Sequence, residues 1–279
     1  MFARYLKSAR LAIVLGGGIV VGAAQAFAAE RADVESFLKV TGFDVAIESI
    51  ALGAEDAPSM LGLEQDAFGK RWRQLSEEIF VPAQMLQQAT DMLAEALAQD
   101  LLKHAIQFYE SDLGTRLVAA ENLSHMDDPD LKHIAGREII AQMVQKGDAK
   151  IGFFQRMNVA IDPEDLGLRA VQEIQVRFLV AASRAGVIER DLDEAMLWAQ
   201  IRETEAEVRR SMQAAALTGS AYTYQGFSED ELETYTEALE DPKMQKVYEL
   251  MNAVHFRIMG DRFDALAQRL DALRPSQEL

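Results

Sequence analysis

The sequence contains no cysteine among its 279 residues. Disulfide bonds, thiolate metal ligands, cysteine nucleophiles and lipid attachment at a signal cysteine are therefore excluded. A chain without disulfides must be held together by its apolar core. Hydrophobic residues make up 49% of the sequence, which is enough for a sizeable core, and the length after residue 28 suits one large domain or two small ones.

The motifs of common catalytic and metal sites are also missing. The four histidines form no H-E-x-x-H or Glu-x-x-His pair, and no G-x-S-x-G elbow or phosphate-binding G-x-x-x-x-G-K loop occurs. His125 lies near Asp127, Asp128 and Asp130, but this acidic turn is better explained by aspartates that cap the next helix. We assign no catalytic, cofactor-binding or metal-ligating residue from the sequence, expect no cofactor, and favour a non-enzymatic protein.

Basic residues are scarce relative to acidic ones. Three of the 28 basic residues and none of the 45 acidic ones lie in residues 1–28, so a chain that starts at residue 29 carries a net charge of −20. Nucleic-acid binding and docking on anionic lipid both depend on basic patches, so both are disfavoured. The acidic balance favours a solubility surface, a basic partner or loosely held cations.

The first 28 residues have the organisation of a secretory signal. Arg4, Lys7 and Arg10 precede an apolar run, and Ala24-Gln25-Ala26 and Ala26-Phe27-Ala28 both fit the A-x-A cleavage pattern. We therefore expect residues 1–28 to be a signal peptide and the protein to be periplasmic, with no membrane contact after cleavage. The alternative is an uncleaved anchor, which the glycines at positions 16–18 and 22 disfavour.

The remainder, residues 29–279, is expected to be an all-α domain. Six prolines, abundant helix-forming residues and no clean two-residue alternation indicate helices rather than strands. Asp-Pro pairs at 128–129, 162–163 and 241–242 each predict a helix start, because the carboxylate caps and proline suits the first helical position. Ser228 and Glu231 have the spacing of a capping box.

Apolar stripes at helical spacing run through three stretches of the chain. The longest begins after Pro242 and is predicted to be core, with a partner-helix groove as the alternative; it comprises Met244, Val247, Tyr248, Met251, Val254, Ile258, Phe263, Leu266 and Leu270. The others begin at Leu166 and Leu192. We expect Trp72 and Trp198 to be core, and the segment 218–226 to be a loop whose two tyrosines pack back onto the bundle.

The sequence contains a weak internal repeat. A shift of 130 residues places 107–117 over 237–247, and in both copies a helix ends in glutamate, a capping Ser or Asp follows, and a new helix starts. This pattern predicts two pseudo-repeated helical halves, about 29–158 and 159–279.

The first corner resembles a known family. Residues 108–114, Phe-Tyr-Glu-Ser-Asp-Leu-Gly, are similar to the FYxSPxG-like signature of a bacterial exported family catalogued as domain of unknown function 2059. Residues 35–43 resemble that family's opening segment, and 227–247 look like a second, degenerate copy. Asp112 replaces the usual proline, and the second copy lacks the glycine. The resemblance implies export and a helical fold, and it carries no catalytic or ligand residues.

Three functions remain open at this point. The leading hypothesis is a non-enzymatic, envelope-associated module that binds another envelope protein through a helical groove. The second is a carrier of a small apolar or lipid-like ligand between helices, and the third is a cell-envelope hydrolase that uses a carboxylate pair. A homo-oligomer through the long C-terminal helix is also considered.

Overall fold

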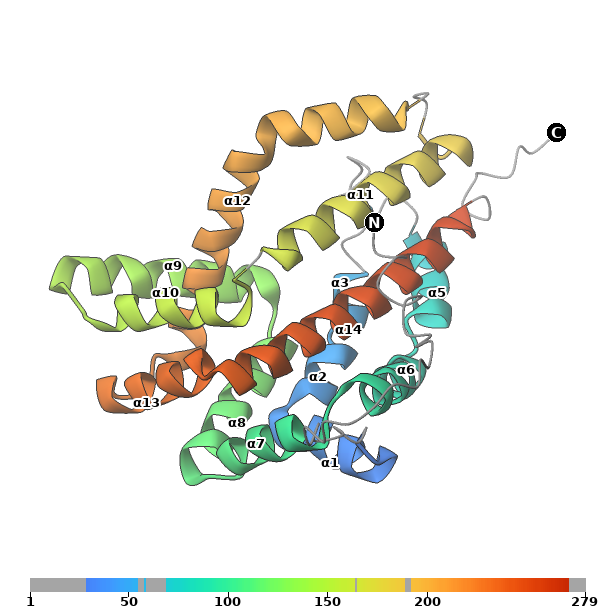
Figure 1. Ribbon diagram of the computed structural model, residues 1–279. Coiled ribbons are helices and arrows are strands. Elements are labelled where there is room, and N and C mark those ends of the chain that lie inside the picture. The colour runs from blue at the N-terminus through green and yellow to red at the C-terminus, as the bar shows by residue number, and fades with distance from the viewer. Residues whose placement is uncertain (1–28, 55–57, 59–68, 164, 189–191, 271–279) are drawn as a thin grey trace, which may run out of the picture.

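The computed structural model describes residues 29–54, 58, 69–163, 165–188 and 192–270, and no β-strand occurs among them. The expected fold class, an all-α multi-helix bundle, is confirmed (Figure 1). The helices are α1 (Arg31–Thr41), α2 (Phe43–Glu48), α3 (Ile50–Gly53), α5 (Gly69–Ile79), α6 (Pro82–Ala96), α7 (Gln99–Tyr109), α8 (Asp112–Met126), α9 (Pro129–Lys146), α10 (Lys150–Ile161), α11 (Leu166–Arg184), α12 (Glu194–Tyr224), α13 (Glu229–Glu240) and α14 (Pro242–Ala267).

The predicted signal peptide, residues 1–28, lies outside the described part of the chain. Within the described helices, none combines the length and the apolar character that crossing a bilayer requires.

Most predicted helix starts are confirmed. Asp128 accepts hydrogen bonds from the backbone N–H groups of residues 130 and 131, and Asp241 accepts them from residues 243 and 244. In each case proline occupies the first helical position. Ser228 and Glu231 form the complete capping box at the start of α13.

The start at Asp162–Pro163 is the exception, because α11 begins three residues later, at Leu166. Asp165 adopts a left-handed backbone conformation with φ 52°, so the chain is not helical at that position between α10 and α11. The Asp162 carboxylate nevertheless accepts hydrogen bonds from the N–H groups of Leu166 (2.8 Å) and Gly167 (3.0 Å). The capping chemistry was therefore predicted correctly, and the helix boundary was not.

Helix α14 forms the central element of the core, as its apolar stripe predicted. It contacts α11 along much of its length and also packs against α5, α6, α7, α10 and α13 (Figure 1). The buried residues of the stripe are Met244, Val247, Met251, Val254, Ile258, Phe263, Leu266 and Leu270. Only Tyr248 of the predicted set is partly exposed, and its position becomes important below.

Helix α12 differs most from the sequence prediction. It continues to Tyr224, so residues 218–224 are helical and the predicted loop is wrong except for the turn after Tyr224. Gly219 lacks a positive φ here, so it does not end the helix. The side chain of Trp198, which we expected in the core, is only partly buried, and no residue of α12 before Thr218 is buried.

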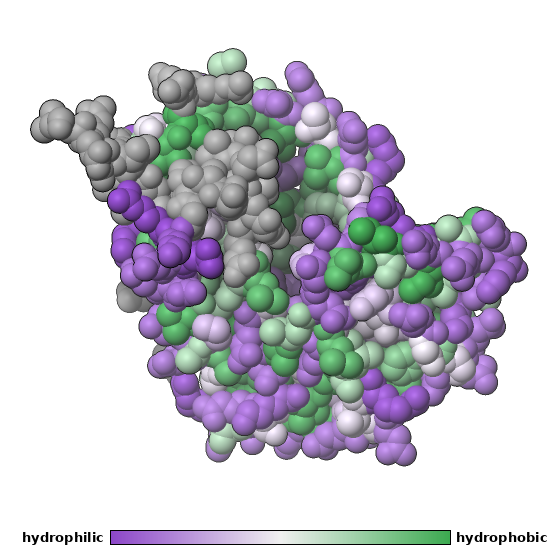
Figure 2. Space-filling model, turned by 180° about the vertical axis from the view of Figure 1, so that it is seen from behind, coloured by the Kyte–Doolittle hydropathy of each residue, from purple (hydrophilic) through white to green (hydrophobic). Residues whose placement is uncertain are grey.

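The first half of α12 forms an arm, defined here as residues 194–213. In Figure 1 the helix bends near its middle, and the arm runs beside α11 at the edge of the molecule. The second half packs against α8, α9 and α10. Figure 2 shows the opposite side, where hydrophilic side chains are interspersed with apolar ones and a hollow lies in the upper half.

Both corners of the internal repeat exist. The first joins α7 to α8 through Ser111, whose hydroxyl accepts from Gly114 N–H, and the second joins α13 to α14 through Asp241. The second corner also packs against α7. His104 Nε2 lies 3.0 Å from Asp241 Oδ1, and the Lys243 ammonium lies 3.1 Å from Asp100 Oδ2. The division into two pseudo-repeated halves, 29–158 and 159–279, stays a prediction.

Candidate functional site

Five side chains meet where both corners approach the end of α12, and we call them the tyrosine–glutamate cluster. They are Tyr109 of α7, Glu121 of α8, Tyr224 of α12, Tyr235 of α13 and Tyr248 of α14. The hydroxyls of Tyr224 and Tyr235 both donate to Glu121 Oε1, at 2.7 and 2.8 Å. The Tyr109 hydroxyl lies 2.5 Å from that of Tyr248 and 3.5 Å from that of Tyr235.

Local packing fixes the positions of these tyrosines. Tyr109 is the last residue of α7, and the close approach of Gly114 lets α8 begin directly beside it. The rings of Phe108 and Tyr235 stack with centroids 5.8 Å apart and planes 8° apart. The Tyr224 and Tyr235 rings pack edge to face at 5.8 Å. These contacts stabilise the orientation in which the phenol groups lie beside Glu121.

Glu121 is the chemical centre of the cluster. Its Oε1 accepts two hydrogen bonds, whereas its Oε2 accepts none from any described residue. No ion pair among the described residues includes Glu121. Burial raises the pKa of Glu121, and the hydrogen bonds from Tyr224 and Tyr235 oppose this rise. The carboxylate is thus partly buried, held on one side by phenols, and without a counter-ion among the described residues.

The phenols are hydrogen-bond donors rather than bases. Burial raises the pKa values of Tyr109, Tyr224, Tyr235 and Tyr248, and the negative charge of Glu121 raises each of them further. All four side chains therefore stay protonated at neutral pH. They can stabilise a carboxylate, but they cannot remove a proton from a substrate there.

A cavity of about 240 Å³ opens beside Glu121, and we call it the Glu121 pocket. Its lining mixes polar, aromatic and aliphatic side chains and comes from the six helices α8, α9, α10, α12, α13 and α14: Glu121, Ser124, His125, Lys132, Met157, Asn158, Ile161, Ser220, Thr223, Tyr224, Tyr235, Leu239 and Tyr248.

Hydrogen bonds among the lining residues fix the shape of the Glu121 pocket. Thr223 donates to Ser124 Oγ at 2.8 Å, and the Lys132 ammonium donates to the Ser124 carbonyl at 2.7 Å. Ser220 donates to Asn158 Oδ1 at 3.1 Å. The polar walls are therefore preformed, as binding sites for small molecules usually are.

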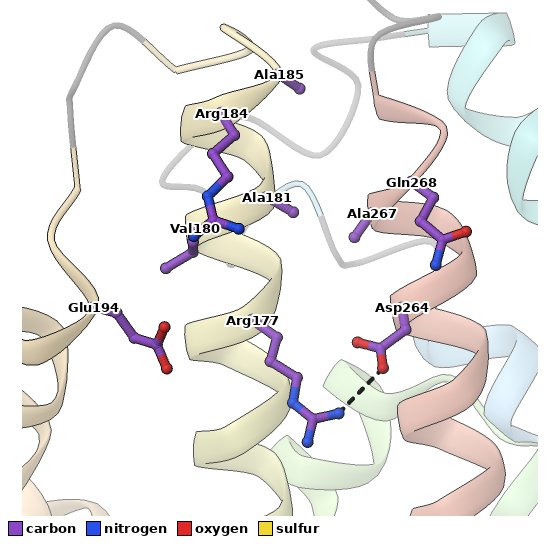
Figure 3. A pocket seen from close by; sticks show the side chains of 9 residues that line it. All are labelled: Arg177, Val180, Ala181, Arg184, Ala185, Glu194, Asp264, Ala267 and Gln268. Atoms are coloured by element: carbon purple, nitrogen blue, oxygen red, sulfur yellow. Dashed lines mark hydrogen bonds and ion pairs between the residues drawn. The ribbon is translucent and has the colours of Figure 1, made fainter.

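A larger cavity, of about 470 Å³, lies elsewhere, between α11, α14 and the start of α12 (Figure 3). It contains two carboxylates, but Asp264 forms an ion pair with Arg177 at 3.1 Å. Figure 3 draws Glu194 on the other side of α11 from Asp264. The two carboxylates do not converge, so this cavity offers a groove without the geometry of an acid–base pair.

The residues that the sequence singled out lie mostly outside the Glu121 pocket. Trp72 points inward, as predicted, and its Nε1 donates to the Ala54 carbonyl at 3.0 Å. Asp128 caps α9, which supports the capping interpretation of the acidic turn. His125 lines the pocket, and burial lowers its pKa. No group of three potential metal-ligating side chains occurs in the described part of the chain.

Ser36 and Lys39 have the S-x-x-K spacing of penicillin-type enzymes. Both side chains are exposed on α1, and Ser36 lines neither the Glu121 pocket nor the cavity between α11 and α14. The spacing therefore reflects two positions on a solvated helix face.

Sequence reasoning missed every member of the cluster as a functional residue. The signal that could have revealed it is the distribution of tyrosine. Five of the six tyrosines lie between residues 109 and 248, and four of those meet at Glu121.

Comparison with known proteins supports the resemblance found in the sequence. Residues 83–142 match the model of a family described as "Uncharacterized protein conserved in bacteria (DUF2059)". The matched stretch includes Tyr109, Gly114 and Glu121. No curated protein and no solved structure matches the chain.

Proposed function

We propose that the protein is an exported, periplasmic binding protein without catalytic activity, and that its ligand is a small polar molecule held in the Glu121 pocket. The single observation that carries this proposal is the carboxylate of Glu121. It lines a preformed polar cavity, and one of its oxygens has no partner among the described residues. A convergent polar group in a cavity is the usual mark of a ligand site.

The proposal of export rests on the composition of residues 1–28, with its basic start, apolar run and A-x-A sites. Cell fractionation of the full chain and of a variant that lacks residues 2–28 tests it. The full chain should be released by osmotic shock in a shortened form, and the variant should stay in the cytoplasm. Retention of the full chain in the membrane fraction supports the uncleaved anchor instead.

The chemistry of the pocket supports binding over hydrolysis. Glycoside hydrolysis ordinarily needs two carboxyl groups about 5–9.5 Å apart. Glu121 is the only carboxylate among the described residues that line the Glu121 pocket, and the surrounding phenols remain protonated. The pocket also supports a ligand with a polar group over the wholly apolar or lipid-like one that the sequence suggested, because Glu121, Lys132 and Asn158 line it beside the tyrosine rings.

Native mass spectrometry of the protein released from the periplasm tests for a bound small molecule. A Thr223→Phe variant fills the pocket, and Thr234→Phe is the matched control on an exposed face of α13. We expect a small-molecule adduct on the wild type and on the control, and none on Thr223→Phe. The proposal fails if the wild type carries no adduct after incubation with a periplasmic extract, or if Thr223→Phe retains it.

A second candidate function is binding of an envelope protein through the arm of α12. Leu197, Trp198 and Ile201 are only partly buried, and Met196 is 73% exposed. Cross-linking in the periplasm should then recover a stoichiometric partner with the wild type and lose it with Trp198→Glu. A cross-linked product of twice the chain's mass would identify the partner as a second copy.

A further inference from the structure

The negative charge of Glu121 has no counter-ion within the described protein. Every arginine or lysine that forms an ion pair there does so with another carboxylate, as in Arg116–Glu231 and Lys243–Asp100. Lys132, which also lines the Glu121 pocket, directs its ammonium to the Ser124 carbonyl. A partly buried carboxylate that lacks a cationic partner carries a desolvation cost, so a cation that enters the pocket is favoured.

The phenols around Glu121 prepare it for a cationic ligand. Tyr224 and Tyr235 satisfy Oε1 and leave Oε2 as the acceptor on the carboxylate. The phenol oxygens retain lone pairs that can accept further N–H groups. Three tyrosine rings also line the cavity, and aromatic rings attract cations when water is excluded.

We infer that the ligand of the Glu121 pocket carries a primary ammonium group, which donates to Glu121 Oε2. This inference rests on the proposed function, because it names the chemical class of the ligand in that pocket. An anionic ligand would be repelled by Glu121, and a neutral one would leave the charge uncompensated. The excess of acidic over basic residues in the whole chain adds a long-range attraction for cations.

Isothermal titration calorimetry with two probes of equal shape tests the inference. The probes are n-butylammonium chloride and 1-butanol, which differ chiefly in the charge of the terminal group. The proteins are the wild type, Glu121→Gln, and Glu237→Gln as a control on an exposed part of α13. Circular dichroism establishes that each variant keeps its helical content.

Butylammonium should bind the wild type and Glu237→Gln alike, and about tenfold or more weakly to Glu121→Gln, the loss expected for a hydrogen bond to a charged group. Butanol should bind none of them measurably. Equal binding of the two probes, no binding of butylammonium, or an unchanged affinity in Glu121→Gln overturns the inference. The native mass spectrometry experiment decides separately whether the pocket holds any ligand, so the two proposals can fail independently.

Discussion

The hydroxyl of Tyr235 donates to Glu121 Oε1 at 2.8 Å, although the two residues are separated by 114 positions in the sequence. Tyr224 donates to the same oxygen from a third helix. The contact joins α8, which lies in the segment that matches the bacterial family, to α13, which lies in the proposed second half of the repeat. The site therefore exists only because the two corners pack against each other.

Tyr235→Phe should reduce the free energy of unfolding by about 1.5–3 kcal/mol, because it removes one of the two donors to the partly buried carboxylate of Glu121. Urea denaturation near neutral pH measures the loss. Tyr222→Phe is the control, since Tyr222 also donates to a carboxylate, that of Asp127, but outside the cluster. A loss for Tyr235→Phe no greater than that for Tyr222→Phe would show that the cluster adds nothing to stability.

Glu121→Gln should increase stability near neutral pH. The pKa of Glu121 is raised in the folded protein, mainly by burial, so ionisation above that pKa costs folding free energy. As the pH falls through the folded pKa toward the ordinary value, this cost disappears, and the advantage of the variant should shrink. Thermal unfolding of the wild type and of Glu121→Gln, at neutral pH and near the ordinary pKa of a glutamate, measures the difference in stability. A variant that is less stable than the wild type at neutral pH contradicts this account.

His255 should make the protein less stable as the pH falls. Burial, with a smaller effect of His125, lowers the pKa of His255 from 6.5 to about 4. The unfolded state therefore binds a proton first, and stability that is complete above pH 6.5 is lost as the pH approaches 4. The full effect is at most about 3.4 kcal/mol.

The difference in unfolding free energy between wild type and His255→Gln isolates this effect from Glu121, whose contribution has the opposite sign. We expect a smaller acid-dependent loss in His255→Gln, and the wild-type loss in His133→Gln, which changes an exposed histidine of α9. Parallel profiles of unfolding free energy against pH for the wild type and His255→Gln would show that His255 does not cause the loss of stability in acid.

Gly114→Ala should destabilise the protein by about 1–3 kcal/mol, because a methyl group would overlap backbone that cannot move aside. It would lie 2.6 Å from the Tyr109 Cα and would also clash with the Phe108 carbonyl oxygen. Gly152→Ala in α10 is the matched control; its methyl group meets nothing within 4 Å, so it should stabilise by about 0.5–1 kcal/mol. If both changes are stabilising, the close approach at the first corner has no structural importance.

The parts of the fold that were predictable are those set by neighbouring residues. The caps at Asp128, Ser228 and Asp241 depend on contacts within three positions, and the α14 stripe depends on a regular spacing. The end of α12 was mispredicted because glycine, serine and threonine at 218–220 suggested a loop. In the fold, Thr218 and Ser220 are buried and donate to backbone carbonyls of the preceding turn.

The candidate site could not be predicted from the sequence, because its members come from five helices. Tyr109 and Tyr248 are separated by 139 positions, and no local pattern reports such a contact. The resemblance located Tyr109 within a signature but assigned it no role. The prediction that Trp198 is buried is wrong for a related reason. An apolar spacing on the arm of α12 leads to burial only when another element covers that face.

The wide sequence separation of the phenols has a consequence for biogenesis. A chain that is synthesised from its N-terminus gains Tyr109 and Glu121 more than a hundred residues before Tyr235 and Tyr248. Such distant pairings form late, because the connecting segments must be ordered first. The tyrosine–glutamate cluster is thus expected to assemble after the local helix corners, and the proposed ligand site would form with it.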